Sequence, residues 1–272
     1  MPALTTAYNL AFSNSGQGNY ADAGLFGHEV TGSEKRVRGV EPIDKLDAAK
    51  NLATSLTRQG KYAEAAEVQR EVLGFQERVL GIERPSTLMA ASNLAATFMR
   101  QGKYAEAEEM EREMLGVKKR VLGAEHPSTL ATANNLAASL SIQGRHAEAE
   151  EVQRELLGLQ EHVLGVEHPA TLTAAGNLAA TFLRQGKYGL AEAIQREVLG
   201  VRKRVLGAEH PNTLGAAGNL ATTLAYQGDY FDAEQMLQVV LASCHRVLGP
   251  AHPTTQLTTR SLENVRAKLP VH

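Results

Sequence analysis

The sequence repeats itself every 42 residues, and this period restricts the possible folds more than any other feature of the chain. The segment Gly-Lys-Tyr-Ala-Glu-Ala at 60–65 returns unchanged at 102–107. Altered copies stand at 18–23, 144–149, 186–191 and 228–233. A period of this length is typical of solenoids, in which each repeat is one supersecondary unit and neighbouring units share a continuous core.

Each repeat is predicted to hold two helices, which we call the first and the second helix. In the first helix, Leu52 and Leu56 mark a buried stripe at a spacing of four residues. The second helix is predicted from about Ala63 to Leu80, where Val68 and Val72 recur at helical rather than strand spacing.

Glycine and proline recur at the expected helix ends. Glycine adopts a left-handed turn without a Cβ clash, and a proline in the first turn loses no helical hydrogen bond. The glycines between the two helices are Gly18, Gly60, Gly102, Gly144, Gly186 and Gly228. The glycines after the second helix are Gly39, Gly81, Gly123, Gly165, Gly207 and Gly249. The prolines that open the next first helix are Pro85, Pro127, Pro169, Pro211 and Pro253.

These signals predict an all-α fold, an α-solenoid of six helix pairs with a C-terminal cap helix. Alanines at fixed offsets, such as Ala137 and Ala149, indicate close contact between helices. The first repeat is degenerate, as expected for a terminal unit. The repeats are placed at about 4–45, 46–87, 88–129, 130–171, 172–213 and 214–255, and the cap helix at 256–272. In the cap, Leu257, Leu262, Val265 and Leu269 are predicted to form the apolar stripe.

The composition indicates which classes of partner and which cellular compartment to expect. The 28 Lys and Arg residues nearly balance the 30 Asp and Glu residues, so a nucleic-acid partner is not expected. No run of 18 apolar residues and no secretory leader is present, which predicts no membrane span. The single cysteine, Cys244, permits no internal disulfide. We therefore expect a cytoplasmic protein.

The repeat resembles a known family. The residues that carry the resemblance are Asn51-Leu52-Ala53, Gly60-Lys61-Tyr62, Ala65, Val79-Leu80-Gly81 and Glu125-His126-Pro127. This pattern is similar to the tetratricopeptide repeat, in the 42-residue form of kinesin light chain and nephrocystin-3-like proteins. The resemblance covers about Leu4 to Thr255 and implies a right-handed superhelix that binds segments of other proteins. From the period itself, residues 1–272 are expected to form a single array.

The recurring histidines and the single cysteine are the candidates for metal binding or catalysis. His126, His168, His210 and His252 stand before the prolines, but equivalent helices lie about 10 Å apart, too far for one zinc ion. A junction role, bonding the loop into the next helix, is therefore expected, with no metal and no cofactor. No Gly-x-Ser-x-Gly elbow, phosphate loop or Cys-x-x-Cys pair is present, so no enzyme is predicted. Cys244 is expected to be exposed, and the charges from Glu106 to Arg120 to form a solvated helix face.

An asparagine at one offset of every first helix is the sharpest functional signal. Asparagine is a poor residue for a helix interior, so a ladder of them requires a reason. The ladder comprises Asn9, Asn51, Asn93, Asn135, Asn177 and Asn219. In tetratricopeptide proteins this offset lines the groove and holds a peptide backbone, since an amide both donates and accepts. The alternative is that the asparagines tie adjacent first helices together.

A second column lies seven residues after each asparagine. It carries Arg58, Arg100 and Arg184, with Ile142 and Tyr226 in other repeats. Guanidinium groups here favour an acidic ligand. We thus expect a monomeric, non-enzymatic scaffold that binds an extended acidic peptide of a partner protein. The alternative is an architectural, self-assembling array or the sensor end of a larger signalling protein.

Overall fold

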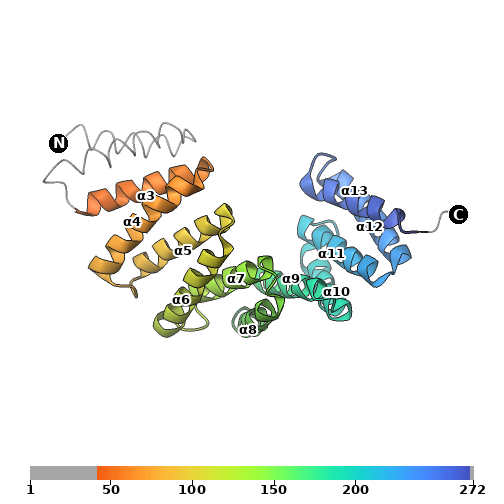
Figure 1. Cartoon of the computed structure of the whole chain (residues 1–272). Coiled ribbons are helices and arrows are strands. Elements are labelled where there is room, and N and C mark those ends of the chain that lie inside the picture. Colours follow the sequence, from red (N-terminus) through yellow and green to blue (C-terminus); the bar gives the residue numbers. More distant parts are fainter. Residues whose placement is uncertain (1–41, 270–272) are drawn as a thin grey trace. The chain divides into compact units, whose positions relative to one another are not determined.

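The computed structural model describes residues 42–269, and every regular element in this range is an α-helix. The first helices are α3 (Pro42–Arg58), α5 (Pro85–Gln101), α7 (Pro127–Ile142), α9 (Pro169–Arg184) and α11 (Pro211–Gln227). The second helices are α4 (Tyr62–Leu80), α6 (Tyr104–Leu122), α8 (His146–Leu164), α10 (Tyr188–Leu206) and α12 (Tyr230–Val247). A last helix, α13 (Pro253–Arg266), follows them (Figure 1).

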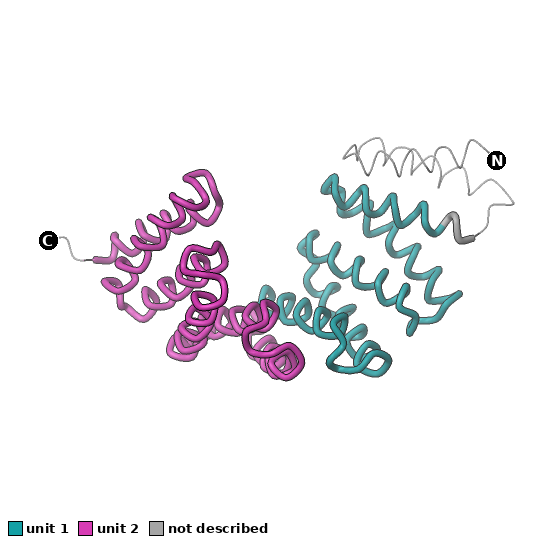
Figure 2. Tube along the Cα trace, turned by 180° about the vertical axis from the view of Figure 1, so that it is seen from behind, with its two compact units in different colours: residues 1–143 teal, residues 144–272 magenta. Residues whose placement is uncertain are grey.

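The predicted solenoid of helix pairs is confirmed in the described residues. Within each unit, consecutive helices pack against each other, as α5 does against α4 and α6 and as α11 does against α10 and α12. The chain forms two compact units that divide after Gln143 (Figure 2). Unit 1 contains α3 to α7, and unit 2 contains α8 to α13. The first predicted repeat lies almost wholly outside the described residues.

The predicted helix ends are confirmed in detail. A proline occupies the first turn of α5, α7, α9, α11 and α13. The predicted turn glycines within the described residues all have positive φ, for example 75° at Gly102 and 93° at Gly123. Residues with a Cβ rarely adopt this conformation, so the glycines fix where each helix stops.

The alanines at the fixed offsets are buried between packed helices. Ala137 on α7 is 1% exposed, and Ala149 on α8 is fully buried. In unit 2 the core continues through the last repeat to α13, where Leu262 and Val265 are buried. Small residues at these positions allow the helices to approach closely, which buries the large leucines between them.

The C-terminal cap begins at Pro253 rather than at the predicted Gln256. The reason is that His252 and Pro253 repeat the junction that opens α7, α9 and α11, so the cap is itself a first helix. Its predicted stripe is partly wrong, because Leu257 is 62% exposed while Leu262 and Val265 are buried. The helix packs against α12 and α11 and covers the end of the core.

Cys244 is buried, which corrects the expectation of an exposed thiol. Its offset on the second helices faces the first helix of the next repeat, here α13. Burial raises the pKa of the thiol, and a hydrogen bond with Thr258 of α13 partly opposes this. The expected exposure is wrong because this offset is buried even where it carries a polar residue, as at Gln76 and Lys118.

The charge run of α6 is likewise not wholly solvated. Glu111 is 1% exposed and Lys118 is 2% exposed, whereas Glu113 and Arg120 lie on the solvent side. Lys118 Nζ donates to Ser92 Oγ of α5 at 3.0 Å and to Thr132 Oγ1 of α7 at 2.7 Å. The correction has a simple cause: a second helix is covered on two sides, by its own first helix and by the next one.

Candidate functional site

The asparagine ladder lies on the accessible side of the first helices. Asn93 and Asn135 in unit 1 and Asn219 in unit 2 are exposed. Asn51 and Asn177 are partly buried, and Asn9 lies outside the described residues. The next residue along each helix, such as Leu94 or Leu136, is buried in the core. The helical period therefore turns the core face inward and leaves the asparagines on its border.

Three of the asparagine side chains do not link adjacent first helices. The amides of Asn93, Asn135 and Asn219 make no hydrogen bond to the part of the chain that the structure describes. The main-chain carbonyl of Asn93 accepts a bond from Thr97 Oγ1, but the amide group takes no part in it. These amides are therefore available to a ligand.

The arginine column lies on the same helices and is exposed. Arg58, Arg100 and Arg184 are all on the surface, and Ile142 and Tyr226 at the same offset are 52% and 61% exposed. Lys268, after the end of α13, holds this offset in the cap and is exposed as well. Sequence reasoning missed Lys268 because it treated the cap as separate from the repeats.

Two residues at this offset, Arg100 and Tyr226, face the residue that begins the preceding second helix. The guanidinium of Arg100 lies over the ring of Tyr62 at 5.9 Å. Tyr226 stacks on Tyr188 in unit 2, with ring centroids 5.9 Å apart and planes at 26°. Both pairs join residues that are 38 positions apart, so the arrangement repeats with the solenoid. Aromatic rings thus line the surface beside the cations.

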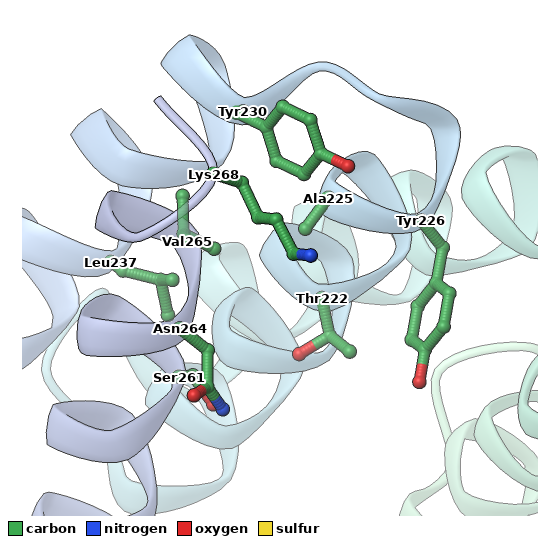
Figure 3. A pocket seen from close by; sticks show the side chains of 9 residues that line it. All are labelled: Thr222, Ala225, Tyr226, Tyr230, Leu237, Ser261, Asn264, Val265 and Lys268. Atoms are coloured by element: carbon green, nitrogen blue, oxygen red, sulfur yellow. The ribbon is translucent and has the colours of Figure 1, made fainter. Parts of the chain in front are cut away.

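Unit 2 ends in a cavity of about 310 Å³ at the same surface (Figure 3). Tyr230 and Lys268 line it together, and they hold the same pair of offsets as Tyr62 and Arg100. Tyr226 stands at its edge, and Leu237 and Val265 supply apolar walls. A pocket with an ammonium group, two phenols and an apolar wall suits a side chain that is both acidic and partly apolar.

Three glutamines next to the arginine column bond to the residue that begins the preceding second helix. Gln143 Nε2 donates to the main-chain carbonyl of Tyr104 at 3.1 Å. Gln101 and Gln185 donate in the same way to the carbonyls of Tyr62 and His146. In the last repeat Gln227 donates to the Glu192 side chain instead. The three main-chain bonds tie the starts of α4, α6 and α8 to the ends of α5, α7 and α9. They were not predicted, although glutamine recurs at 59, 101, 143, 185 and 227.

One carboxylate near this surface is strongly held in its ionised form. Lys187 Nζ donates to Glu150 at 2.8 Å and Arg154 donates to it at 2.9 Å. The bond from Lys187, with the smaller effect of Arg154, lowers the pKa of Glu150 to about 2, against some desolvation. Glu150 is therefore an internal partner of cations, not an acid or base poised for catalysis.

The histidine column has the predicted junction role. His126 Nδ1 accepts from the main-chain N–H of Ser128 at 3.1 Å and so caps α7. His168, His210 and His252 cap the following first helices in the same way. Within residues 42–269 no cluster of three metal-ligating side chains occurs.

Comparison with known proteins agrees with this architecture. The family model of the tetratricopeptide repeat matches residues 44–120, 128–204 and 171–244, which together make up more than half of the chain. The chain therefore belongs to the tetratricopeptide repeat family. No curated protein sequence gives a significant match. None of the described helices is long and apolar enough to cross a bilayer.

Several solved structures are similar in fold. The nearly identical TPR-like repeats of a protein described as a kinesin light chain, from Podosopora anserina, share 28% identity. This match has a TM-score of 0.69 and covers 76% of this chain and 98% of that one. BtubC from P. vanneervenii matches with a TM-score of 0.67 at 18% identity, over 92% of this chain and 94% of its own.

A third similar structure is a signal-transduction ATPase with numerous domains, from Pyrococcus horikoshii, which has a tetratricopeptide repeat sensor. It matches with a TM-score of 0.67 at 11% identity, over 96% of this chain and 38% of that chain. The kinesin light chain-like character of the repeats is thus confirmed, and the fold is that of a protein-interaction scaffold. Proteins of this family are generally not enzymes.

Proposed function

We propose that this protein binds an extended, acidic peptide segment of a partner along the exposed faces of its first helices. The observation that carries the proposal is the coincidence of two columns on these faces. Asn93 and Asn135 offer amides that make no other hydrogen bond in the described chain, and Arg100 offers a guanidinium beside them. The proposal applies to each unit by itself, with Asn177, Asn219 and Arg184 in unit 2.

The column of asparagine amides is suited to bind the main chain of a peptide. A peptide backbone presents donors and acceptors at regular intervals whatever its side chains, and one amide per repeat can match them. The asparagines would then give affinity without sequence preference. The helices that carry them are rigid because their opposite faces are buried, so little ordering of the scaffold accompanies binding.

The arginine column, together with Lys268, would give the protein its preference for acidic ligands. Arg100 stacks on Tyr62, which holds its guanidinium plane in place, and Lys268 lines the cavity at the end of unit 2 with Tyr230. A held guanidinium forms charge-assisted bonds to Asp or Glu with less loss of side-chain freedom. Acidic residues of the ligand are therefore expected to lie over this column.

The test separates backbone binding from charge preference. A peptide array probed with the intact chain supplies acidic and neutral ligands, whose dissociation constants are then measured by fluorescence anisotropy. Changing Asn93 and Asn135 to Ala should weaken all ligands alike. Changing Arg100 and Arg184 to Ala should weaken acidic ligands most and flatten the salt dependence of binding.

Stability is the control for these variants. Neither pair should lower the melting temperature much, because alanine is the better helix former and the positions lie outside the core. If the asparagine pair unfolds the protein and leaves the affinity per folded molecule unchanged, the ladder is structural and the proposal fails.

An architectural array, or the sensor end of a larger signalling protein, is the second candidate. The similarity to an ATPase with a tetratricopeptide repeat sensor supports it at the level of the fold. Light scattering at several concentrations distinguishes self-assembly from peptide binding. A peptide binder should remain monomeric, whereas the mass of an architectural array should grow with concentration.

A further inference from the structure

The second helices of unit 2 border a crevice that the first-helix surface does not include. It has a volume of about 510 Å³ and lies between α10 and α12, above α11. Leu199, Leu214 and Leu224 line it, and none of the asparagine or arginine columns takes part. We call it the α10–α12 crevice. Its volume lies within the range of ligand-binding pockets, about 300–1,000 Å³.

The equivalent crevice in unit 1, between α4 and α6, is almost closed. Its volume is only about 40 Å³, although its lining residues hold the same offsets in the repeat. Four positions carry a smaller side chain in unit 2. Three of them line both crevices and are, with the unit 1 residue first, Ile82 and Ala208, Met114 and Val240, and Val117 and Ser243. The fourth is Leu224, which lines the open crevice and replaces Phe98.

Phe98 stands at the position that Leu224 holds in unit 2. The ring is 3% exposed and lies under the guanidinium of Arg70 at 5.0 Å. Phe182 is covered by Arg154 at 5.1 Å in the same way. Leu224 offers no ring for the equivalent Arg196 to cover, and Arg196 donates to Glu192 on its own helix at 2.7 Å, as Arg154 does to Glu150. The open crevice therefore coincides with the smaller side chains of the last repeat.

The charge at the border differs between the crevices of the two units. Glu77 and Glu113 border the closed crevice of unit 1, and Lys203 and Val239 replace them in unit 2. Val239 is 69% exposed, which places an apolar side chain at the mouth. Lys203 on α10 and Asp232 on α12 stand on opposite sides and form no ion pair within residues 42–269. The crevice thus has an apolar floor between a basic and an acidic wall.

We propose that the α10–α12 crevice binds an amphipathic helical segment of a partner protein. Bulky aliphatic side chains of that segment fill the space above Leu224 and Ser243, and Val239 extends the apolar contact. An acidic residue on one flank meets Lys203, and a basic residue on the other meets Asp232. A helix that lies in a groove between two helices is a common mode of peptide recognition, and the two walls fix its direction.

A synthetic peptide tests this directly. The probe is a labelled helical peptide of about 16 residues, with leucines at i, i+4 and i+7, glutamates on one flank and lysines on the other. Its binding to the intact chain is followed by fluorescence anisotropy. The variant Ala208→Ile, Leu224→Phe and Ser243→Val, which restores the unit 1 residues, should weaken binding about tenfold or more. Circular dichroism checks that the variant is folded.

A charge reversal checks the direction of the segment. Lys203→Glu should weaken the probe and strengthen a second peptide in which the glutamates and lysines are exchanged. The Asn93→Ala and Asn135→Ala variant should bind the probe normally, because the crevice does not depend on the first-helix surface. Absence of saturable binding, or equal binding by the filled variant, would overturn the proposal.

Discussion

Gln185, just after α9, donates a hydrogen bond of 2.8 Å from its side-chain Nε2 to the main-chain carbonyl of His146, the first residue of α8. The same bond joins Gln143 to Tyr104 in unit 1. Gln101 makes the same bond to Tyr62, whose ring lies under the guanidinium of Arg100. In these three places the glutamine therefore connects two repeats beside the surface that we propose for ligand binding.

Replacing Gln185 with Glu should lower the free energy of unfolding by about 1 kcal/mol or more, because the side chain keeps its shape, loses the donor and places a second carboxylate beside Glu150, to which Gln185 also bonds. Chemical denaturation of unit 2 measures the effect. Gln235→Glu, at an exposed position of α12, is the matched control and should change stability little. Equal stability of the two variants would show that the bond to His146 contributes nothing.

Much of the fold was predictable because the turns repeat. Glycines such as Gly102 and prolines such as Pro127 mark helix ends through backbone geometry alone, and the structure places them there. The exposure of Asn93 and Arg100 also follows from the helical period, since their neighbours Leu94 and Phe98 are buried.

The side of the second helix that faces the next repeat was harder to predict. Gln76, Lys118 and Cys244 share one buried offset, and polar residues there suggest solvent until the next first helix is placed over them. The contact between Arg100 and Tyr62 was equally hidden, because it joins residues 38 apart in two repeats. Periodicity identifies equivalent residues, but it does not say which of two covering helices each one meets.

Glu111 should make the stability of unit 1 depend on pH. Burial, and to a smaller degree the charge of Glu108, raises the pKa of Glu111 to about 7, although a bond from Ser139 at 2.7 Å opposes the rise. The folded protein then binds the proton more tightly than the unfolded chain. Stability should be greatest below the unfolded value of about 4.5 and fall as the pH rises through 7, on the order of 2 kcal/mol.

The residues at the equivalent position of other repeats suggest a variant that tests the role of Glu111. Gln69, Gln153 and Gln195 occupy the same offset as Glu111 in other repeats. Glu111→Gln should raise the free energy of unfolding at pH 8 and have a much smaller effect near pH 5. Glu113→Gln, on the exposed side of α6, is the control. If the free energy of unfolding of both variants depends on pH as it does in the unaltered protein, Glu111 is not the group whose protonation changes the stability.

Cys244 should react slowly with a bulky thiol reagent in the native protein. The side chain is fully buried against α13, and burial raises the pKa of the thiol, so little thiolate forms at neutral pH. Val239→Cys in a Cys244→Ser background places a thiol at a position that is 69% exposed and should react at least about tenfold faster. Comparable labelling rates would mean that α13 leaves the core readily.

Ala137 tests how closely the helices of unit 1 pack. Its side chain on α7 is 1% exposed, and α7 packs against α6. Leucine at this position should lower the free energy of unfolding by about 1 to 3 kcal/mol, because it overfills a close helix contact. Ala131→Leu adds the same atoms to an exposed site on the same helix and should change stability by less than about 0.5 kcal/mol. Denaturation curves of the two variants give the comparison. Identical curves would show that the contact at Ala137 has room for the larger side chain and that the alanine column does not set the distance between helices.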